Sequence, residues 1–310
     1  MPVRSISLIC VELRDIEYFA TVAQYGHLGR AAEALGLGQP ALSMSLRRLE
    51  TSAKAKLVTR TAKGVELTAV GAALLSHVSK LRVARDDLAR EVADLVQGRA
   101  GHLRIGTSPS NSEVFVHEAC STLLMEAPKV TLSVSVMDND TLVPALRKGE
   151  LDLALTHTQR FTPPDIAQVV FRTDEFIIYC ASKHRLAKRK SIRLDDLVQE
   201  RWAISAAGAF GPLLSLRDAF TARGLPLPTV TVVSDLVMFK LRVVAASDLV
   251  GVTVRQNVNA AVGQLRLKIL PVKDLVWLRP VAIAYRKDAY LSPAAKRFVE
   301  IISAIAKKRC

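Results

Sequence analysis

Apolar residues near the start of the chain recur with the spacing of one face of an amphipathic helix. Positions i, i+3, i+4 and i+7 of this pattern are Ile16, Phe19, Ala20 and Ala23. The pattern predicts a helix over residues 13–24. A second, shorter helix is predicted over residues 30–35. The run Gly36-Leu37-Gly38 then predicts a turn in which one glycine takes positive φ.

A third helix is predicted to open at Gln39-Pro40, because a proline in the first helical turn lacks only an N–H that would be unpaired there. Three leucines share one face of this helix, and the opposite side carries Pro40, Met44, Arg47 and Thr51. The order helix, short helix, glycine turn, helix is typical of a helix-turn-helix, whose last helix enters the major groove of DNA. Any three-helix bundle shares much of this pattern.

The segment after the third helix is basic. Residues 59–67 predict two short strands around a basic tip, a wing suited to phosphate or minor-groove contacts. Between Gln39 and Glu66 there are six lysines and arginines and two acidic residues, a local excess of +4. These features favour a DNA-binding module over a charged surface that is simply solvated.

Residues 68–97 predict one long helix with a seam of alternating four- and three-residue spacing. Such a heptad seam is typical of a left-handed coiled coil. The alternative is a long helix packed on its own domain. Polar residues on the other faces favour a dimerising linker, whose seam is Leu74, Val78, Leu81, Leu88, Val92 and Leu95, with Arg85 as the one charged position.

Beyond residue 101 the pattern changes to short apolar strands alternating with helices, which predicts an α/β fold with a largely parallel sheet. Proline-rich breaks at residues 161–165 and 270–272 are candidate crossovers between two lobes. The predicted strands cover residues 103–106, 130–136, 151–155, 176–181, 202–205, 249–254 and 281–285. Helices are predicted over residues 142–148, 236–246 and 292–307.

Composition adds few constraints. The chain has 310 residues, half of them hydrophobic, and a net charge of +14, which agrees with about two packed domains and a polyanionic or acidic partner. Residues 101–310 hold 29 basic and 19 acidic side chains, so most of the surplus, +10, lies outside the DNA-binding module; solvated surface is the favoured interpretation. No secretory signal or membrane span is predicted, and no membrane partner is expected.

The four cysteines are scattered as Cys10, Cys120, Cys180 and Cys310, without metal-ligand spacing, which fits a reducing cytoplasm and buried small side chains. Cys120 and Cys180 are the one pair that a redox sensor could use. No metal or cofactor is expected. The sequence also lacks G-x-S-x-G, H-E-x-x-H and a glycine-rich phosphate loop, which argues against an enzyme.

The N-terminal third resembles the LysR-type transcriptional regulators over residues 13–19, 30–35, 39–43 and 46–50 and along the wing to Thr68 and Gly71. Looser similarity covers residues 103–106, 149–155 and Trp202. The resemblance implies an α/β protein with an N-terminal winged helix-turn-helix (residues 11–68), a long linker helix (69–98) and a two-lobed effector-binding domain like a periplasmic binding protein (101–310). Lobe one would then be residues 101–163 with 270–310, and lobe two residues 164–269.

The same resemblance implies a sequence-specific DNA-binding regulator that is controlled by a small, anionic effector between the lobes. Its expected partners are promoter DNA, the effector, a second copy in a homodimer, a homotetramer, and RNA polymerase. The alternative is a bi-lobed receptor or enzyme whose helical module does not bind DNA. Several positions depart from the family pattern. His27 stands where a Ser/Thr helix cap is usual, a loss of roughly 1 kcal/mol. Lys54 and Val58 replace a glycine and a phenylalanine, and Met44 replaces a polar or basic residue.

The candidate DNA-binding residues lie on the third helix and the wing. Glutamine can pair with adenine, and arginine with guanine or phosphate. Met44 could contact a thymine methyl group. The full set is Gln39, Pro40, Ser43, Met44, Arg47, Arg60 and Lys63.

The candidate effector-binding residues lie at predicted strand ends. Hydroxyls and free N–H groups after the first strand of the α/β region form a natural anion site. For His157 a purely structural polar role is the favoured alternative. The full set is Thr107, Ser108, Ser110, Thr141, His157, Ser205, Phe210 and Thr253.

Overall fold

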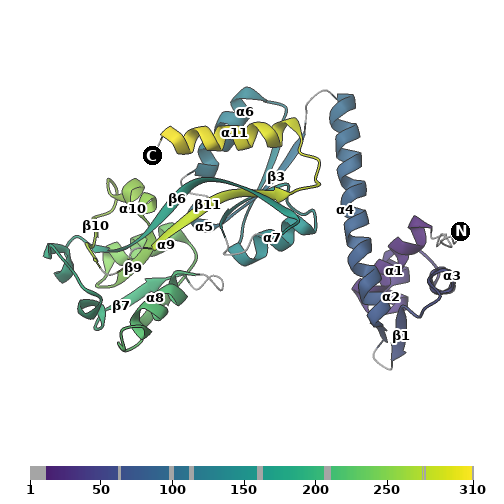
Figure 1. Cartoon of the computed structure of the whole chain (residues 1–310), viewed down its shortest axis with the longest axis horizontal. Helices are drawn as coiled ribbons and strands as arrows, with labels where there is room; N and C mark the ends of the chain where they lie inside the picture. Colours follow the sequence, from purple (N-terminus) through teal and green to yellow (C-terminus); the bar gives the residue numbers. More distant parts are fainter. Residues whose placement is uncertain are drawn as a thin grey trace, which may run out of the picture. The chain divides into compact units, whose positions relative to one another are not determined.

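The computed structural model divides the chain into two compact units, residues 1–86 and 87–310. Figure 1 shows the helices and strands of each. The structure describes residues 12–61, 64–97, 101–111, 115–158, 163–205, 211–273, 275 and 277–308.

The first unit is a winged helix-turn-helix. Its three helices pack around one apolar core, and a two-stranded antiparallel hairpin follows the third helix. The predicted order of elements is confirmed. The elements are α1 (Leu13–Tyr25), α2 (Leu28–Ala34), α3 (Gln39–Ala53), β1 (Val58–Thr61), β2 (Gly64–Leu67) and the start of α4 (Ala69–Gln97).

The leucine face of α3 points into this core, as its spacing predicts. Leu42, Leu46 and Leu49 are at most 5 % exposed and pack with Phe19 of α1. Burying each such side chain contributes about 1.5–3 kcal/mol. Val78 of α4 packs in the same core, so the N-terminal part of the linker helix completes this unit.

The predicted loss of a cap at α2 is wrong. The ring of His27 replaces the usual hydroxyl: its Nδ1 accepts a hydrogen bond from the backbone N–H of Gly29 at 3.1 Å. The turn into α4 depends on close packing at Gly71, where a Cβ would lie 2.0 Å from the carbonyl oxygen of Leu57. The hydroxyl of Thr68 accepts from the N–H of Gly71 at 3.0 Å and so satisfies one free donor of α4.

The linker helix runs from Ala69 to Gln97, as predicted, but its seam divides into two parts. Val78 is 1 % exposed and Leu74 is half-buried, and both pack in the core of the first unit. The buried side chain of Val78 is therefore unavailable to a partner helix, which corrects its prediction as an interface residue. The rest of the seam is exposed by 48–76 %: Leu81, Leu88, Val92 and Leu95.

The second unit is built on one nine-stranded sheet in the order β4-β3-β5-β11-β6-β9-β7-β8, with β10 paired to β6. Two long strands, β6 and β11, pair with each other and run through both lobes (Figure 1). The strands are β3 (His102–Thr107), β4 (Thr131–Val136), β5 (Leu153–His157), β6 (Ile166–Ala181), β7 (Arg201–Ile204), β8 (Thr229–Val233), β9 (Val250–Val254), β10 (Leu267–Ile269) and β11 (Trp277–Arg286).

Helices cover both faces of the sheet in each lobe, so the α/β prediction is confirmed. The prediction of a largely parallel sheet is wrong: the sheet is mixed, because the two crossing strands β6 and β11 run antiparallel to each of their neighbours. In lobe one, α6 and α11 pack on one face and α7 on the other. The helices are α5 (Pro109–Asn111), α6 (His117–Glu126), α7 (Asn139–Arg147), α8 (Pro212–Thr221), α9 (Val237–Ala246), α10 (Arg255–Ala261) and α11 (Pro293–Lys308), with 3₁₀ turns η2 (Arg185–Lys188) and η3 (Leu194–Leu197).

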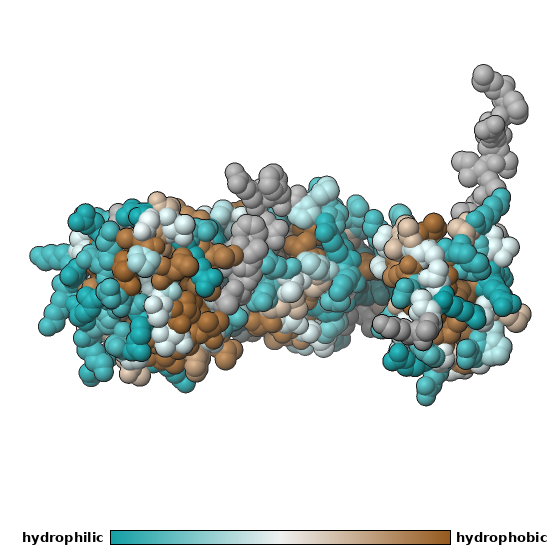
Figure 2. Space-filling view, turned by 90° about the horizontal axis from the view of Figure 1, so that it is seen from below, coloured by the Kyte–Doolittle hydropathy of each residue, from teal (hydrophilic) through white to brown (hydrophobic). Residues whose placement is uncertain are grey.

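Lobe two has a core on each side of its sheet. One contains Trp202 and Phe220, whose rings meet edge to face with centroids 6.3 Å apart, and the other lies under α9. Apolar side chains also remain on its surface, at the edge formed by β8 and α9. Figure 2 shows apolar patches among polar residues at this lobe. Exposed members include Leu227, Val233, Leu236 and Phe239.

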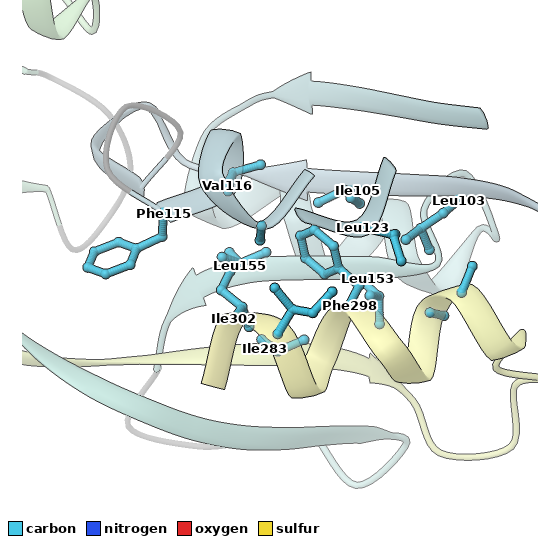
Figure 3. Packing of buried hydrophobic residues seen from close by; sticks show 14 of the residues in the cluster. Leu103, Ile105, Phe115, Val116, Leu123, Leu153, Leu155, Ile283, Phe298 and Ile302 are labelled. Carbon is cyan, nitrogen blue, oxygen red and sulfur yellow. The ribbon is translucent and has the colours of Figure 1, made fainter. Parts of the chain in front are cut away.

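Figure 3 shows the core of lobe one between the sheet and the helix pair α6 and α11. Phe298 and Ile302 of α11 face Leu155 of β5 and Ile283 of β11, all fully buried. The amphipathic pattern of α11 accounts for this packing, since its apolar positions recur at helical spacing. The same packing fixes the two strands whose other ends reach the groove between the lobes.

The lobes join at other residues than predicted. The sequence predicts crossovers near Pro163 and Leu270. Along β6, however, Phe171 still packs in the core of lobe one, and Phe176 packs in the core of lobe two. On the return path Leu270 packs in lobe two and Ile283 in lobe one. The crossovers thus lie inside the paired strands β6 and β11. Continuous backbone pairing, with a bulge opposite residues 281 and 282, replaces the proline-rich loops as the connection.

Candidate DNA-binding surface and effector cleft

The outer face of α3 gathers the residues predicted to read DNA. Gln39, Pro40, Met44 and Arg47 are exposed and Ser43 is half-buried. Proline at the start and a core-facing leucine stripe orient this face outward. The arrangement presents an amide, a hydroxyl and a guanidinium on one helix face, which can hydrogen-bond to base edges and phosphates.

The wing lies beside this face. Nη2 of Arg60, on β1, donates a hydrogen bond to Oγ of Ser43 at 3.1 Å. This hydrogen bond joins the wing to the outer face of α3 and places the Arg60 guanidinium beside it. Lys63, also predicted to bind DNA, lies outside the described residues.

The two adjacent arginines of α3 have different roles. Arg48 makes a two-pronged ion pair with Asp15 of α1, at 2.7 Å from Nε and 2.5 Å from Nη2, and Ser45 donates to the same carboxylate at 2.6 Å. Asp15 is buried, and the Arg48 guanidinium holds its pKa below the usual value despite that burial. Arg48 thus fixes α3 to α1 although its side chain is 52 % exposed, and Arg47 is the member of the pair that lies on the face predicted to read DNA.

Lys56, one of the basic residues in the local count, forms an ion pair with Glu50 of the same unit. Glu50 is 8 % exposed and accepts hydrogen bonds from the Nζ of Lys56 at 2.7 Å and from the N–H of Leu57 at 3.0 Å. Burial alone would raise the pKa of Glu50, but these bonds outweigh it and the pKa is lowered. This ion pair cancels one positive and one negative charge that the local count already includes, so it leaves the excess of +4 unchanged, whereas the pair of Arg48 with Asp15, outside residues 39–66, lowers the excess by one.

A cleft lies between the two lobes of the second unit, with a cavity volume of about 60 Å³. Four predicted residues line it: Ser108, Ser110, His157 and Ser205. The other lining residues are Pro109, Asp138, Asn139, Asp140, Phe176, Gly211, Pro212, Asp235 and Arg279. The lining thus comes from strand ends and the loops and first helical turns that follow them in both lobes, and from the two crossing strands.

Three other predicted residues do not line the cleft. Thr107 is fully buried, and its hydroxyl donates to the carbonyl oxygen of Ser108 at 3.3 Å, so it supports the loop. Thr141 is exposed on α7 and donates to the carbonyl oxygen of Asp138 at 2.8 Å. Thr253 is buried and accepts from Asn257 at 3.1 Å. In each case the hydroxyl satisfies a local backbone or side-chain group. Phe210 lies outside the described residues.

His157 is anchored as well as facing the cleft. Its Nε2 lies 2.8 Å from Oδ2 of the fully buried Asp174, and its Nδ1 lies 3.5 Å from Nδ2 of Asn139. Burial, together with the guanidinium groups of Arg172 and Arg279, lowers the pKa of His157 to about 3. The ring is therefore neutral, with Nε2 as the donor to Asp174. It offers the cleft a fixed polar wall rather than a positive charge.

The sequence reasoning missed the charged residues of the cleft. Asp138 and Asp235 each follow the end of a strand by two residues. This shared position could be recognised only with the bounds of both strands. Arg279 was missed because the last strand was predicted to begin at Val281, whereas β11 begins at Trp277.

Arg279 stands on the crossing strand between the lobes. Its Nη2 donates to Oγ of Ser215 at 2.7 Å, and its guanidinium carbon lies 5.5 Å from the ring centroid of Phe176. Burial lowers the pKa of Arg279, yet a guanidinium stays protonated at neutral pH. Behind the lining, the ammonium of buried Lys240 contacts the hydroxyl of Ser205, and burial lowers its pKa to about 8 against the opposing effect of Asp235.

The structure does not bring the candidate redox cysteines together. Cys120 packs beside the core of lobe one and Cys180 is buried in the core of lobe two. Burial raises the pKa of both thiols, which disfavours the reactive thiolate. Cys10 and Cys310 lie outside the described residues. Within the described part of the chain, no group of three or more His, Cys, Asp or Glu side chains could hold a metal ion.

No helix among the described residues combines the length and the apolar character that crossing a membrane requires.

Comparison with known proteins assigns both units to one family. The family model "Bacterial regulatory helix-turn-helix protein, lysR family" matches residues 13–72, and "LysR substrate binding domain" matches residues 97–306.

Similar curated proteins span nearly the whole chain. The HTH-type transcriptional regulator GbpR of Azospirillum brasilense is 27 % identical over 293 residues, covering 92 % of this chain and 84 % of GbpR. CbbR of Rhodospirillum rubrum is 26 % identical over 95 % of this chain and 97 % of its own length. Among solved structures, full-length CbnR complexed with its target DNA has a TM-score of 0.64 at 20 % identity, covering 95 % of this chain and 99 % of that one.

The solved structure supports the fold, and the curated relatives are transcriptional regulators, which confirms the prediction of a regulator over an enzyme. The two family models together cover well over half of the chain. The chain therefore belongs to the LysR family of DNA-binding transcriptional regulators with an effector-binding domain.

Proposed function

We propose that α3 and the wing read an operator through one surface. The observation that carries this proposal is the shared exposed face of α3, with Gln39, Ser43 and Arg47 on it and Arg60 hydrogen-bonded to Ser43. Gln39 and Arg47 would contact base edges, and Arg60 would contact the phosphate backbone. Met44, 65 % exposed at the centre of this face, would lie against a thymine methyl group.

The regulating small molecule is proposed to bind in the cleft between the lobes. Polar groups from both lobes converge there around a cavity, with Ser108 and His157 from lobe one and Ser205 from lobe two. A ligand that contacts both lobes favours one arrangement of the lobes over another, and can thereby act on the rest of the protein.

The proposed assembly is a homodimer, extended to a homotetramer. Support comes from the exposed seam of α4 at Leu81, Leu88, Val92 and Leu95. A two-fold dimer would present two recognition helices to two half-sites of an operator. The proposed place of action is the cytoplasm, with RNA polymerase as a further partner at the promoter.

The direct test of this function is selective enrichment of DNA from a random pool by the purified full-length protein. The expected result is a two-fold sequence whose half-sites are separated by one or more helical turns. A pool that shows no enriched sequence would instead favour the bi-lobed receptor whose helical module does not bind DNA. A protein with Gln39→Ala and Arg47→Ala serves as the control, and it should enrich that sequence far less.

A further inference from the structure

The two lobes carry matching residues at matching strand ends. In lobe one, β3 pairs in parallel with β4, with Thr107 opposite Val136 as the last pair. In lobe two, β7 pairs in parallel with β8, with Ile204 opposite Val233 as the last pair. Each first strand is followed at once by a serine of the cleft. Each second strand is followed, two residues later, by an aspartate of the cleft.

The aspartates are therefore equivalent positions of the two lobes. Asp138 follows β4 and precedes α7, and Asp235 follows β8 and precedes α9. Carboxyl ends of parallel strands meet at one edge of a sheet, so both residues point toward the crevice where ligands of such folds bind. The two carboxylates thus reach the same cavity from opposite lobes.

Neither carboxylate is fully satisfied by the described residues. Asp138 occupies the position before α7 but its side chain makes no capping bond to that helix. Oδ1 of Asp235 is buried without a hydrogen-bond partner in the described part of the chain. A buried carboxylate oxygen without a donor is costly, which indicates that a donor from outside the chain completes this position.

Among the described residues of the lining, the balance of charge is negative. Three carboxylates, those of Asp138, Asp140 and Asp235, face one guanidinium, that of Arg279, while His157 is neutral. Burial raises the pKa of Asp138, and the charges of Asp235 and Asp140 raise it further, as mutual repulsion requires. Lys240 lies behind Ser205 and opposes only part of this charge.

We infer that the effector carries a cationic amino group, held between Asp138 and Asp235, together with a carboxylate directed to Arg279: a small amino-acid-like zwitterion. This inference rests on the proposed role of the cleft as the effector site and names the chemical class that it takes. An ammonium offers three N–H donors, enough to reach a carboxylate in each lobe at once. A simple anion could pair with Arg279, but it would leave the carboxylates of Asp138 and Asp235 repelling each other.

The same geometry couples binding to the position of the lobes. Without a cation, the aspartates of opposite lobes repel one another, which favours their separation. An ammonium between them attracts both, and the arrangement in which both contacts form is the one the ligand stabilises. Binding of the ammonium by the two aspartates and approach of the two lobes are therefore coupled at this site.

The experiment uses the full-length protein and matched compounds. Each of the twenty protein amino acids is compared, by thermal shift and calorimetry, with its 2-hydroxy acid, where a hydroxyl replaces the ammonium, and with its decarboxylated amine. The expected result is binding of at least one amino acid, with at least tenfold weaker binding of its hydroxy acid and of its amine. Binding of the hydroxy acids alone, or of no amino acid at all, would overturn the inference.

Variants locate the binding. Asp138→Asn and Asp235→Asn should each weaken binding of that amino acid at least tenfold, and leave hydroxy-acid binding unchanged or stronger because repulsion is relieved. Asp218→Asn, at an exposed aspartate of α8, is the matched control and should leave binding unchanged. Equal loss in all three variants would contradict the site. Operator enrichment is a separate measurement, so failure of the ligand class and failure of DNA recognition are told apart.

Discussion

Asp87 of α4 accepts hydrogen bonds from Nη2 of Arg286, 199 residues further along the chain, at 3.0 Å to Oδ1 and 2.9 Å to Oδ2. Both side chains are nearly buried, 12 % and 13 % exposed. Arg90 contacts the same carboxylate and lies 3.4 Å from Asp152, which in turn binds Arg104 of β3. The last turns of α4 are thereby joined by charges to strands β3 and β11 of lobe one.

Asp87→Ala is expected to lower the free energy of unfolding by about 3 kcal/mol, because it leaves the charge of Arg286 buried without its partner. Nη1 of Arg286 is already buried without a partner among the described residues. Denaturant unfolding of the full chain measures the loss. The control is Asp86→Ala, since that neighbour is 58 % exposed and pairs only at the surface with Arg85. Equal losses in the two variants would show that the buried pair has no special role.

The winged unit should be sensitive to acid through Asp15. A carboxylate whose pKa is lowered on folding stabilises the fold above its unfolded pKa, roughly 3.9, and this stability is lost as the pH falls through the folded pKa. The unfolding free energy should therefore fall between about pH 5 and pH 2. In Asp15→Asn the dependence should be shallower and the stability at pH 7 lower, by about 2 kcal/mol.

Urea unfolding followed at several pH values checks the slope. The matched control is Glu33→Gln, on the exposed side of α2, which should keep the dependence of the parent protein. An identical slope in Asp15→Asn would mean that the contact with Arg48 does not contribute to acid sensitivity.

Lys54 ends α3 with φ at 50°, the left-handed conformation that glycine adopts at little cost. Lys54→Gly is expected to stabilise the unit by about 1 kcal/mol, because the Cβ no longer opposes this conformation. Thermal unfolding should show a higher Tm. Lys54→Ala removes the same charge but keeps the Cβ, so it should bring no such gain; a similar rise in both variants would trace the effect to charge.

Much of this fold was predictable because its signals are local. The leucine spacing of α3, the glycine turn and the heptad spacing of α4 each depend on neighbouring residues, and the structure confirms these elements. The crossovers were not predictable in the same way. Pro163 marks a real break, but β6 continues the lobe-one core as far as Phe171, a long-range packing fact that no local pattern expresses.

The two candidate sites differ in the same way, since one depends on local signals and the other on long-range packing. The DNA-binding face follows from one helix, so Gln39 and Arg47 were found from its periodicity. The cleft is assembled from strand ends far apart in the sequence, and only the serines and His157 were found. Asp235 was missed because β8 itself was not predicted. A single sequence shows that a strand ends in a polar residue, and the pairing of strands decides which of those ends meet.

Arg47→Ala is expected to weaken operator binding by about 1–3 kcal/mol and to relax the preference at one base pair, as loss of a base-edge contact does. Arg48→Ala should act instead through stability, because that guanidinium pairs with Asp15. Fluorescence titration of the enriched operator and of single-base variants separates the two, with Tm as a second readout. If Arg47→Ala binds every sequence as tightly as the parent, the proposed orientation of α3 on DNA is wrong.

Leu88→Glu tests the exposed part of the linker seam. Leu88 is 61 % exposed in the single chain, and a charge at this position would have to be buried in a helix-to-helix interface. The dissociation constant of the dimer is expected to rise by about tenfold or more, measured by sedimentation of the full-length protein. Ala93→Glu adds the same charge at an exposed position of α4 away from the seam, and should leave assembly unchanged. If Leu88→Glu sediments like the parent protein while Tm is unaffected, the dimer contacts lie elsewhere than on this face of α4.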